Sequence, residues 1–231
     1  MPKTVLITGA SSGFGLLTAN LLHESGHKVY GTSRNPKWHK TDFELLEMDV
    51  REEDSINRAI SYILSQENEI DVLVNNAGFG ISGPIEETSI SEAKAQFETN
   101  FFGMARMTKA VLPQMRSRKN GLIINIGSIG GHIGLPFQGY YSASKFAIEG
   151  FTEALRIEVR PYNVDILNIN PGDFSTGFTA NRQLIEFVSE EYRPRFEVAL
   201  KVYEKDEKGG SDPKIVARLI ENLIRKEKSY K

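Results

Sequence analysis

The sequence contains no cysteine, which excludes disulfide bonds, thiolate metal sites and a cysteine nucleophile. Its four histidines lack the spacing of metal ligands, so we expect no metal site. No apolar run approaches the ~20 residues that a membrane-spanning helix needs. The formal net charge is −2, and this balance argues against nucleic acid or an anionic membrane surface as the main partner.

The composition itself fits a folded domain. The 231 residues are 40% hydrophobic and 25% charged, a balance typical of one soluble globular domain with a full core. The first apolar run begins at Thr4, which leaves no room for a signal peptide. We therefore expect one domain over residues 1–231 and a cytoplasmic location.

Short apolar runs alternate along the chain with segments of helical periodicity. Strands are predicted at residues 4–7, 28–32, 45–48, 72–74, 122–126 and 164–169. This alternation predicts an α/β fold, a single doubly wound Rossmann-type domain whose central parallel sheet of about seven strands has helices on both faces. Ligands bind such sheets at the carboxyl ends of the strands.

A glycine-rich turn follows the first predicted strand and precedes an amphipathic helix. It reads Thr8-Gly9-Ala10-Ser11-Ser12-Gly13-Phe14-Gly15. Glycines let the backbone approach a ligand closely, and a helix start offers free N–H groups and the positive end of the helix dipole. The spacing Gly-x-x-x-Gly-x-Gly differs from the usual Gly-x-Gly-x-x-Gly fingerprint, but its position between strand and helix predicts a pyrophosphate site.

The end of the second predicted strand indicates which dinucleotide is bound. In dinucleotide-binding folds an acidic residue selects NAD at this point, whereas an arginine accommodates the 2′-phosphate of NADP. Here Ser33 and Arg34 occupy the relevant positions. Our hypothesis is that NADP(H) is preferred over NAD(H), with Ser11, Ser12 and Lys37 as further contacts. The alternative is that Arg34 is a solvated loop charge.

Tyr141 and Lys145 are four residues apart in a predicted helix, and this spacing puts their side chains on one face. A nearby ammonium group favours the phenolate and lowers the pKa of a tyrosine from its usual value of about 10. The pair is therefore a candidate general acid/base. On its own the pattern is weak, because a tyrosine and a lysine on a helix surface are common.

These pieces, in this order and at these spacings, resemble the short-chain dehydrogenase/reductase family over roughly residues 3–178. The resemblance rests on Thr8–Gly15, Asp49-Val50, Asn75-Asn76-Ala77-Gly78, Asn100, Ser128, Tyr141–Lys145, and Pro171-Gly172 followed by Thr176. The stretch from Tyr141 to Phe151 is most similar to the branch that contains hydroxysteroid and retinol dehydrogenases.

The resemblance implies a role for each matching position on the adenine side. Asp49 and Val50 would contact the adenine of the cofactor. Asn76, Ala77 and Gly78 would line the adenine–ribose side and brace the central sheet.

The resemblance also implies the roles of the catalytic residues. Ser128 would hydrogen-bond the substrate oxygen, and Tyr141 would exchange a proton with it. Lys145 would lower the pKa of the tyrosine and bind the ribose of the nicotinamide. Asn100 would kink its helix and hold a water molecule linked to Lys145. An ordinary helix asparagine and a structural serine at a strand end are the alternatives for Asn100 and Ser128.

The turn at Pro171-Gly172 would complete the cofactor site, and Thr176 would bond the nicotinamide carboxamide. Beyond it, residues 178–210 follow no shared motif, and we expect a helical lid over the substrate. The lid aromatics either meet an apolar ligand or pack on the body: Phe178, Phe187, Tyr192, Phe196 and Tyr203. His132 either touches substrate or is simply exposed.

The resemblance implies an NADP(H)-dependent oxidoreductase for a secondary alcohol, ketone or aldehyde, possessing no metal and forming a homodimer or homotetramer. The dimer would use the Tyr141 helix and a helix near residues 93–116. The alternative is a cofactor-sensing binding protein that keeps the fold without catalysis. An epimerase or dehydratase is less compatible with 231 residues, because such relatives mainly have a larger C-terminal substrate domain.

Overall fold

The computed structural model describes residues 1–176 and 181–226. Within these ranges six strands form a parallel sheet in the order β3-β2-β1-β4-β6-β7. Their bounds are Thr4–Ile7 for β1, Lys28–Ser33 for β2, Glu44–Glu47 for β3, Val72–Asn75 for β4, Gly121–Ile126 for β6 and Val164–Ile169 for β7. The chain winds from β1 to β3 in one direction and returns across β1 to reach β4, which confirms the predicted doubly wound α/β fold.

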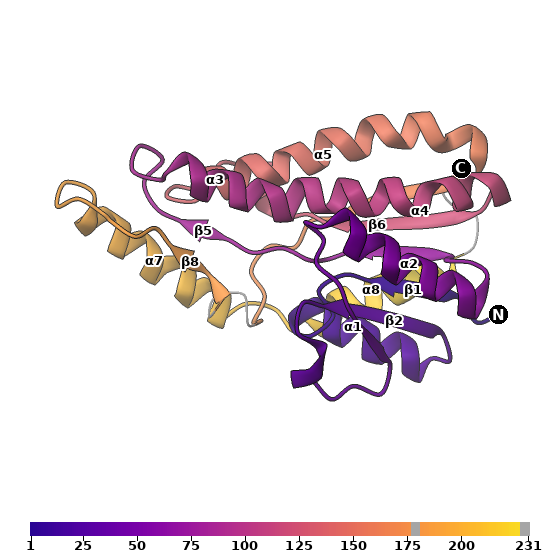
Figure 1. Ribbon diagram of the computed structural model, residues 1–231. Coiled ribbons are helices and arrows are strands. Elements are labelled where there is room, and N and C mark those ends of the chain that lie inside the picture. Colours follow the sequence, from indigo (N-terminus) through magenta and orange to yellow (C-terminus); the bar gives the residue numbers. More distant parts are fainter. Residues whose placement is uncertain (177–180, 227–231) are drawn as a thin grey trace.

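Helices cover both faces of this sheet (Figure 1). Helices α2 (Glu53–Glu67), α4 (Met104–Arg118) and α5 (Gly139–Val159) pack on one face, and α1 (Gly13–Glu24) and α8 (Lys214–Arg225) pack on the other. Helix α3 (Ile90–Phe97) continues into α4 through a π-helical turn, η2 (Glu98–Gly103). Short 3-10 turns are η1 (Pro36–Trp38), η3 (Ile129–Gly131) and η4 (Arg160–Tyr162).

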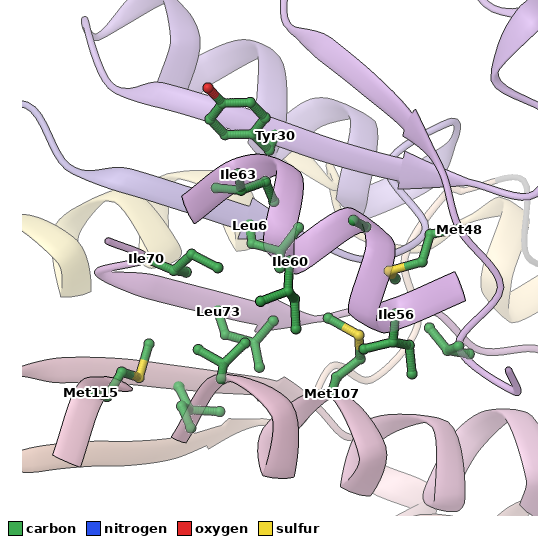
Figure 2. Close-up of a cluster of buried hydrophobic side chains, with 14 of the residues drawn as sticks. Leu6, Tyr30, Met48, Ile56, Ile60, Ile63, Ile70, Leu73, Met107 and Met115 are labelled. Carbon is green, nitrogen blue, oxygen red and sulfur yellow. The ribbon is translucent and has the colours of Figure 1, made fainter. Parts of the chain in front are cut away.

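The core lies in two layers because successive strand residues point to opposite faces. Leu6 and Leu73 face α2 and α4, where they meet Ile60 and Met107 (Figure 2). Val5, Ile7, Val72, Val74 and Ile124 face the layer that α1 and α8 complete. With both faces covered, the central strands β1 and β4 are mostly apolar and buried, as is typical of parallel sheets.

A second, two-stranded sheet lies beyond the carboxyl ends of the main strands. It pairs β5 (Ile81–Ser82) with β8 (Gln183–Leu184) in parallel. Helix α7 (Arg193–Lys208) runs alongside β8, and the two project together from the rest of the molecule (Figure 1). No helix in the described part of the chain is long and apolar enough to cross a bilayer.

Candidate active site

The glycine turn joins β1 to α1 and leaves its backbone open. Gly9 and Gly13 have φ angles of +65° and +55°, which favour glycine. Ser12 caps α1 without a side-chain hydrogen bond, and no atom lies within 4 Å of a Cβ built on Gly13. A Cβ on Gly15 would lie 2.4 Å from the Gly9 carbonyl oxygen. This turn at a helix N-terminus fits a pyrophosphate group.

Asn76 holds the glycine turn from the end of β4. Its Nδ2 donates to the carbonyl oxygens of Thr8 and Gly9 at 2.9 and 3.0 Å. In return, Thr8 Oγ1 accepts from the backbone N–H groups of Asn76 and Ala77, both at 3.0 Å. These bonds fix the turn against the neighbouring strand. The cofactor contacts of Asn76, Ala77 and Gly78 stay predictions.

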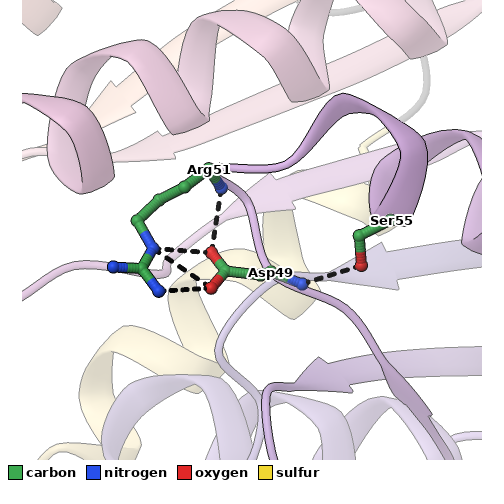
Figure 3. A network of polar contacts seen from close by, with 3 residues as sticks. All are labelled: Asp49, Arg51 and Ser55. Atoms are coloured by element: carbon green, nitrogen blue, oxygen red, sulfur yellow. Dashed lines mark hydrogen bonds and ion pairs between the residues drawn. The ribbon is translucent and has the colours of Figure 1, made fainter.

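The adenine end contains a charged pair that the sequence reasoning missed. Asp49 accepts hydrogen bonds from Arg51, including Nη2 to Oδ2 at 2.6 Å, and its own N–H donates to Ser55 Oγ at 3.1 Å (Figure 3). The Arg51 guanidinium, with a smaller contribution from exposed Arg34, lowers the pKa of Asp49. Arg51 directly follows the Asp49-Val50 motif, and this adjacency could have predicted an ion pair with Asp49.

The side chain of Val50 lies in the core, and its predicted contact with the adenine stays a prediction. The side chain is buried in the core layer of α2 and α4. A Cβ built on Gly103 would lie 2.6 Å from Val50 Cγ2, so the valine packs against the π-helical turn. Only the backbone of Val50 is then available to an adenine ring.

Tyr141 and Lys145 are both buried on α5. Lys145 Nζ donates to the carbonyl oxygen of Ile126 at 2.8 Å and lies 5.7 Å from the centroid of the Tyr141 ring. Burial lowers the pKa of Lys145 to about 8, against an opposing effect of Glu149. The predicted proximity on one helix face is present.

The predicted lowering of the tyrosine pKa by Lys145 is wrong for this arrangement. Burial raises the pKa of Tyr141, and the hydrogen bond with Ser128 lowers it by less. The ammonium group of Lys145 is bonded to the Ile126 carbonyl and lies 5.7 Å from the centroid of the ring. Tyr141 is therefore a protonated phenol at neutral pH.

Ser128 meets Tyr141 from the end of β6. The two side chains share a hydrogen bond, and Ser128 Oγ accepts the N–H of Gly130 at 3.0 Å. A Cβ on Gly130 would lie 3.3 Å from Tyr141 Cε1 and 3.4 Å from Ser128 Oγ. A side chain at this position would therefore crowd both Tyr141 and Ser128.

Asn100 sits in the π-helical turn η2, as its predicted role of kinking the helix requires. Its Oδ1 accepts the N–H of Phe79 at 3.0 Å, and its Nδ2 donates to the Phe79 carbonyl at 3.0 Å and to Ser144 Oγ at 3.2 Å. Ser144 in turn donates to the Tyr141 carbonyl at 2.7 Å. Asn100 thereby ties the chain after β4 to α5. Single π-helical turns are frequent at functional sites.

A buried polar row lies beneath these residues. Asn75, Asn125 and Asn168 occupy paired register positions on β4, β6 and β7. Asn75 Nδ2 donates to Asn125 Oδ1 at 2.9 Å, Asn125 Nδ2 to Thr152 Oγ1 at 2.9 Å, and Thr152 Oγ1 to Asn168 Oδ1 at 2.8 Å. Through Thr152, the row ties β6 and β7 to α5, the helix that carries Tyr141 and Lys145.

The turn after β7 closes the cofactor side. The N–H of Ile129 donates to the Pro171 carbonyl at 2.9 Å, and the N–H of Thr176 donates to the Phe174 carbonyl at 2.9 Å. The Phe174 ring packs edge-on against Phe14 of the glycine turn, with centroids 5.4 Å apart. The structure therefore brings Phe14 and the Pro171–Thr176 segment together, whereas Gly172 is exposed. 

His132 lies in the loop after Ser128, away from the tyrosine hydroxyl. It is exposed, and its Nε2 is 2.9 Å from Asn170 Nδ2. This bond occupies the ring nitrogen, so the alternative that His132 is a surface residue agrees with its position.

Aromatic side chains attach the β8–α7 segment to the body. Tyr192 donates to Glu86 Oε2 at 2.6 Å, and Tyr203 donates to the Pro136 carbonyl at 2.9 Å. The Phe137 ring contacts Tyr192 and Phe196, with centroids 6.5 and 5.5 Å away. Phe187 is exposed, and Phe178 lies outside the described residues.

The backbone of Phe137 is strained. Its φ angle is +58°, a left-handed value that typically costs a bulky residue of the order of 1–3 kcal/mol. Its carbonyl accepts the N–H of Gly83 at 2.8 Å. In this conformation the Phe137 ring contacts Phe196 of α7, and the Phe137 carbonyl is hydrogen-bonded to Gly83 after β5.

A buried ion pair lies in the same segment and was not predicted. Arg182 and Glu207 form it, with side chains 3% and 14% exposed. Glu207 raises the pKa of Tyr141 and Arg182 lowers it. Both charges are therefore close enough to act on the tyrosine hydroxyl. No sequence pattern marks either residue, because 24 residues without a motif separate them.

Comparison with known proteins gives these positions a context. A profile described as short chain dehydrogenase matches residues 3–185. The chain belongs to the short-chain dehydrogenase/reductase family.

Two relatives lie in this family. A 3-ketodihydrosphingosine reductase of Bacteroides thetaiotaomicron is 48% identical over 96% of this chain and 84% of its own length. Human retinol dehydrogenase 8 is 40% identical over 77% of this chain and 60% of its own length. The predicted likeness to the retinol dehydrogenase branch is thus confirmed.

Solved structures share the fold. A short-chain dehydrogenase of Streptomyces avermitilis superposes with a TM-score of 0.88 at 33% identity, covering 99% of this chain and 86% of its own. ElxO with NADP bound superposes with a TM-score of 0.81 at 25% identity, covering 100% and 94%. This member of the short-chain dehydrogenase/reductase family is therefore an oxidoreductase with a nicotinamide-dinucleotide fold.

The family profile covers one part of the site and not the other. Residues 3–185 contain the glycine turn, Asn100, Ser128, Tyr141 and Lys145, but α7 lies beyond them. Glu207 and the aromatic residues of α7 are therefore outside the part of the chain that the family profile describes.

Proposed function

We propose that this protein is an NADP(H)-dependent reductase of long-chain ketones, with Tyr141 as the general acid. The observation that carries the proposal is the buried pair of hydroxyl groups of Ser128 and Tyr141, which share a hydrogen bond at the carboxyl edge of the sheet. Lys145 lies under the tyrosine, and the glycine turn lies at the same edge of the sheet.

When bound, NADP(H) would exchange a hydride with the substrate carbon. Ser128 and Tyr141 donate hydrogen bonds to the carbonyl oxygen, and Tyr141 gives up its proton as negative charge develops there. Its raised pKa keeps the phenol protonated at neutral pH, which is the form that reduction requires. Such proton transfer contributes about 10²–10⁴-fold to the rate. In the oxidative direction the same groups withdraw the proton from an alcohol.

Lys145 and Asn100 support the two hydroxyl groups. The ammonium group of Lys145 is buried near the Tyr141 ring and bonded to the Ile126 carbonyl, and it would bind the nicotinamide ribose. Asn100 holds α5 through Ser144 and thereby keeps Tyr141 in position. A water molecule between Asn100 and Lys145 remains part of this proposal.

Arg34 supports the choice of NADP(H). It is exposed after β2 and acts on Asp49 at the end of β3, so its charge lies at the adenine-ribose end where a 2′-phosphate would be placed. Asp49 at this end is already paired with the Arg51 guanidinium.

The substrate is proposed to be a 3-keto sphingoid base such as 3-ketodihydrosphingosine. The Bacteroides relative with that name is 48% identical. A groove of about 430 Å³ where α7 meets the loop before α5 is lined by Pro84, Ile85, Glu86, Pro136, Phe137, Tyr192 and Arg195. Its apolar rings and Ile85 suit a long alkyl chain, and the β8–α7 segment would act as the lid predicted over residues 178–210.

The proposed assembly is a homodimer, or a homotetramer built from it, in the cytoplasm. Phe146 and Ile157 on α5 and Phe102 at the start of the neighbouring helix are exposed, and Gly150 lies on the same stripe of α5 with open space above it. Apolar stripes of this kind suit an isologous contact between two copies. Light scattering coupled to gel filtration tests this part; a monomer would contradict it.

The test of the function is turnover of 3-ketodihydrosphingosine with NADPH, followed by the loss of NADPH absorbance and by mass spectrometry of the alcohol product. Retinal and short ketones provide the comparison substrates. We expect the long-chain amino ketone to have the highest kcat/KM. Tight NADPH binding without turnover of any carbonyl compound would instead support a cofactor-sensing protein.

A further inference from the structure

The ion pair of Arg182 and Glu207 is placed between two segments that border the reacting oxygen. On one side, the N–H of Gln183, next to Arg182, donates to the Gly80 carbonyl at 2.9 Å. On the other side, α7 ends just after Glu207, and the N–H of Ser211 donates to the Asp173 carbonyl at 3.0 Å. The pair therefore lies between the chain after β4 and the chain after β7.

The two charges are held rigidly. Arg182 stacks over the ring of Tyr203, with its guanidinium carbon 5.8 Å from the ring centroid, and the Tyr203 hydroxyl is bonded to the Pro136 carbonyl. With side chains 3% and 14% exposed, neither charge is strongly screened by solvent. Glu207 raises the pKa of Tyr141 and Arg182 lowers it, so both charges are near the tyrosine.

A buried ion pair of this kind adds little to the free energy of unfolding. Removing two charges from water costs several kcal/mol, and the attraction between them often only balances that cost. The rest of α7 buries a single residue, Phe196, so the segment is held by little apolar burial. A charged pair that acts on Tyr141 and lies between the chain after β4 and the chain after β7 is better explained by recognition of a polar group.

We propose that Glu207 and Arg182 determine substrate specificity by receiving the polar head of an amino ketone. This proposal rests on the function proposed above. A carboxylate has about four lone-pair positions, so Glu207 can keep its bond to Arg182 and accept a further bond from an ammonium group. That ammonium group stands on the carbon next to the ketone carbon, which Ser128 and Tyr141 hold by its oxygen. Arg182 donates to the terminal hydroxyl group of the same head.

The test compares two substrates in one variant. Glu207→Gln keeps the size of the side chain but removes its charge. Kinetics are measured with 3-ketodihydrosphingosine and with the same long-chain hydroxyketone lacking the amino group. Hydrogen bonds to charged groups are worth about 1.5–3 kcal/mol, or about 10–100-fold. We expect kcat/KM for the amino ketone to fall by that factor, mainly through KM, while the value for the hydroxyketone changes less than about 2-fold.

The matched control is Glu204→Gln, one turn earlier on α7. Glu204 is 48% exposed and pairs with Lys208 at 3.4 Å, so this change is expected to leave both substrates unaffected. Any effect of Glu207 on the pKa of Tyr141 acts on both substrates alike and cancels in their ratio. If Glu207→Gln fails to fold, the double variant Arg182→Gln, Glu207→Gln removes both charges together, and the same loss of discrimination is expected.

The outcomes separate the two proposals. If the wild type reduces both ketones but Glu207→Gln lowers them equally, or lowers neither, the specificity proposal is overturned and the proposed function stands. If the wild type binds NADPH yet reduces neither ketone, the proposed function fails and this inference fails with it.

Discussion

The carboxyl edge of the main sheet and the β8–α7 segment contribute to one site but are built differently. At the sheet edge, polar side chains are buried and bonded in rows, as with Asn75, Asn125 and Asn168. In the β8–α7 segment, Phe196 is the sole buried residue of the helix, and side-chain contacts such as Tyr192–Glu86 and Tyr203–Pro136 attach it.

This difference in packing suggests that the sheet edge carries out the proton transfer and that the β8–α7 segment recognises the substrate. The proton-transfer groups depend on strand register and on α5, so they cannot move without disturbing the core. The segment that faces the proposed substrate depends on a few exchangeable side chains, and a change there leaves the sheet intact. We therefore expect substitutions at the sheet edge to affect every substrate, and substitutions in α7 to affect some substrates more than others.

The largest effect is expected from Tyr141→Phe. This change removes the proton donor while keeping the buried ring, so kcat should fall by about 10²–10⁴-fold for every ketone tested. The Kd for NADPH, measured by fluorescence, should change little. A variant that keeps more than about a tenth of the wild-type rate would exclude Tyr141 as the general acid.

Two matched substitutions to alanine compare how much the sheet and α7 contribute to the stability of the fold. Ile124 on β6 is 0% exposed, and Val198 on α7 is 63% exposed. Ile124→Ala should lower the free energy of unfolding by about 2–5 kcal/mol, whereas Val198→Ala should change it by less than about 0.5 kcal/mol. Urea unfolding followed by circular dichroism measures both. Equal losses would show that α7 is as well packed as the sheet.

Local patterns were sufficient to predict the sheet. Each strand is a short apolar run between turn residues, and the predicted strand at residues 72–74 is observed as β4 (Val72–Asn75). The glycine turn could also be predicted, since a strand, three glycines and a helix are adjacent in the chain. The π-helical kink at Asn100 followed from the family resemblance rather than from helical periodicity.

Features that depend on tertiary packing could not be predicted in this way. The pKa of Tyr141 is raised because the fold buries it, and no spacing along α5 reports burial. The asparagine row depends on register between three strands, and the pair of Arg182 and Glu207 joins residues on β8 and α7 that share no motif. The packing of the Val50 side chain against Gly103 could not be predicted for the same reason.

The next effect in size concerns the cofactor at the sheet edge. Arg34→Ala should raise the Kd for NADPH about 10-fold, as loss of one charged hydrogen bond implies, and should leave the Kd for NADH unchanged. Lys40→Ala, an exposed charge further along the same connection, is the control and should affect neither. Tighter binding of NADH than of NADPH by the wild type would contradict the NADP(H) proposal.

The smallest effect is expected at the outer rim of the same edge, from Asp49→Asn. Arg51 lowers the pKa of Asp49 from its usual value, so the folded state binds its proton less readily than the unfolded state does. The carboxylate therefore adds stability above the ordinary Asp pKa, and this contribution is lost as the pH falls through the lowered value.

Its magnitude is expected to be below about 1 kcal/mol, because the side chains of Asp49 and Arg51 are 19% and 44% exposed. Urea unfolding between pH 7 and about pH 3.5, carried out on Asp49→Asn, Arg51→Gln and the double variant, isolates the coupling between the two residues. The coupling should be present at neutral pH and decline at the acid end. A coupling that is independent of pH would show that Asp49 and Arg51 interact through packing and not through charge. The outer rim of the sheet edge would then be stabilised by side-chain contacts, as α7 is.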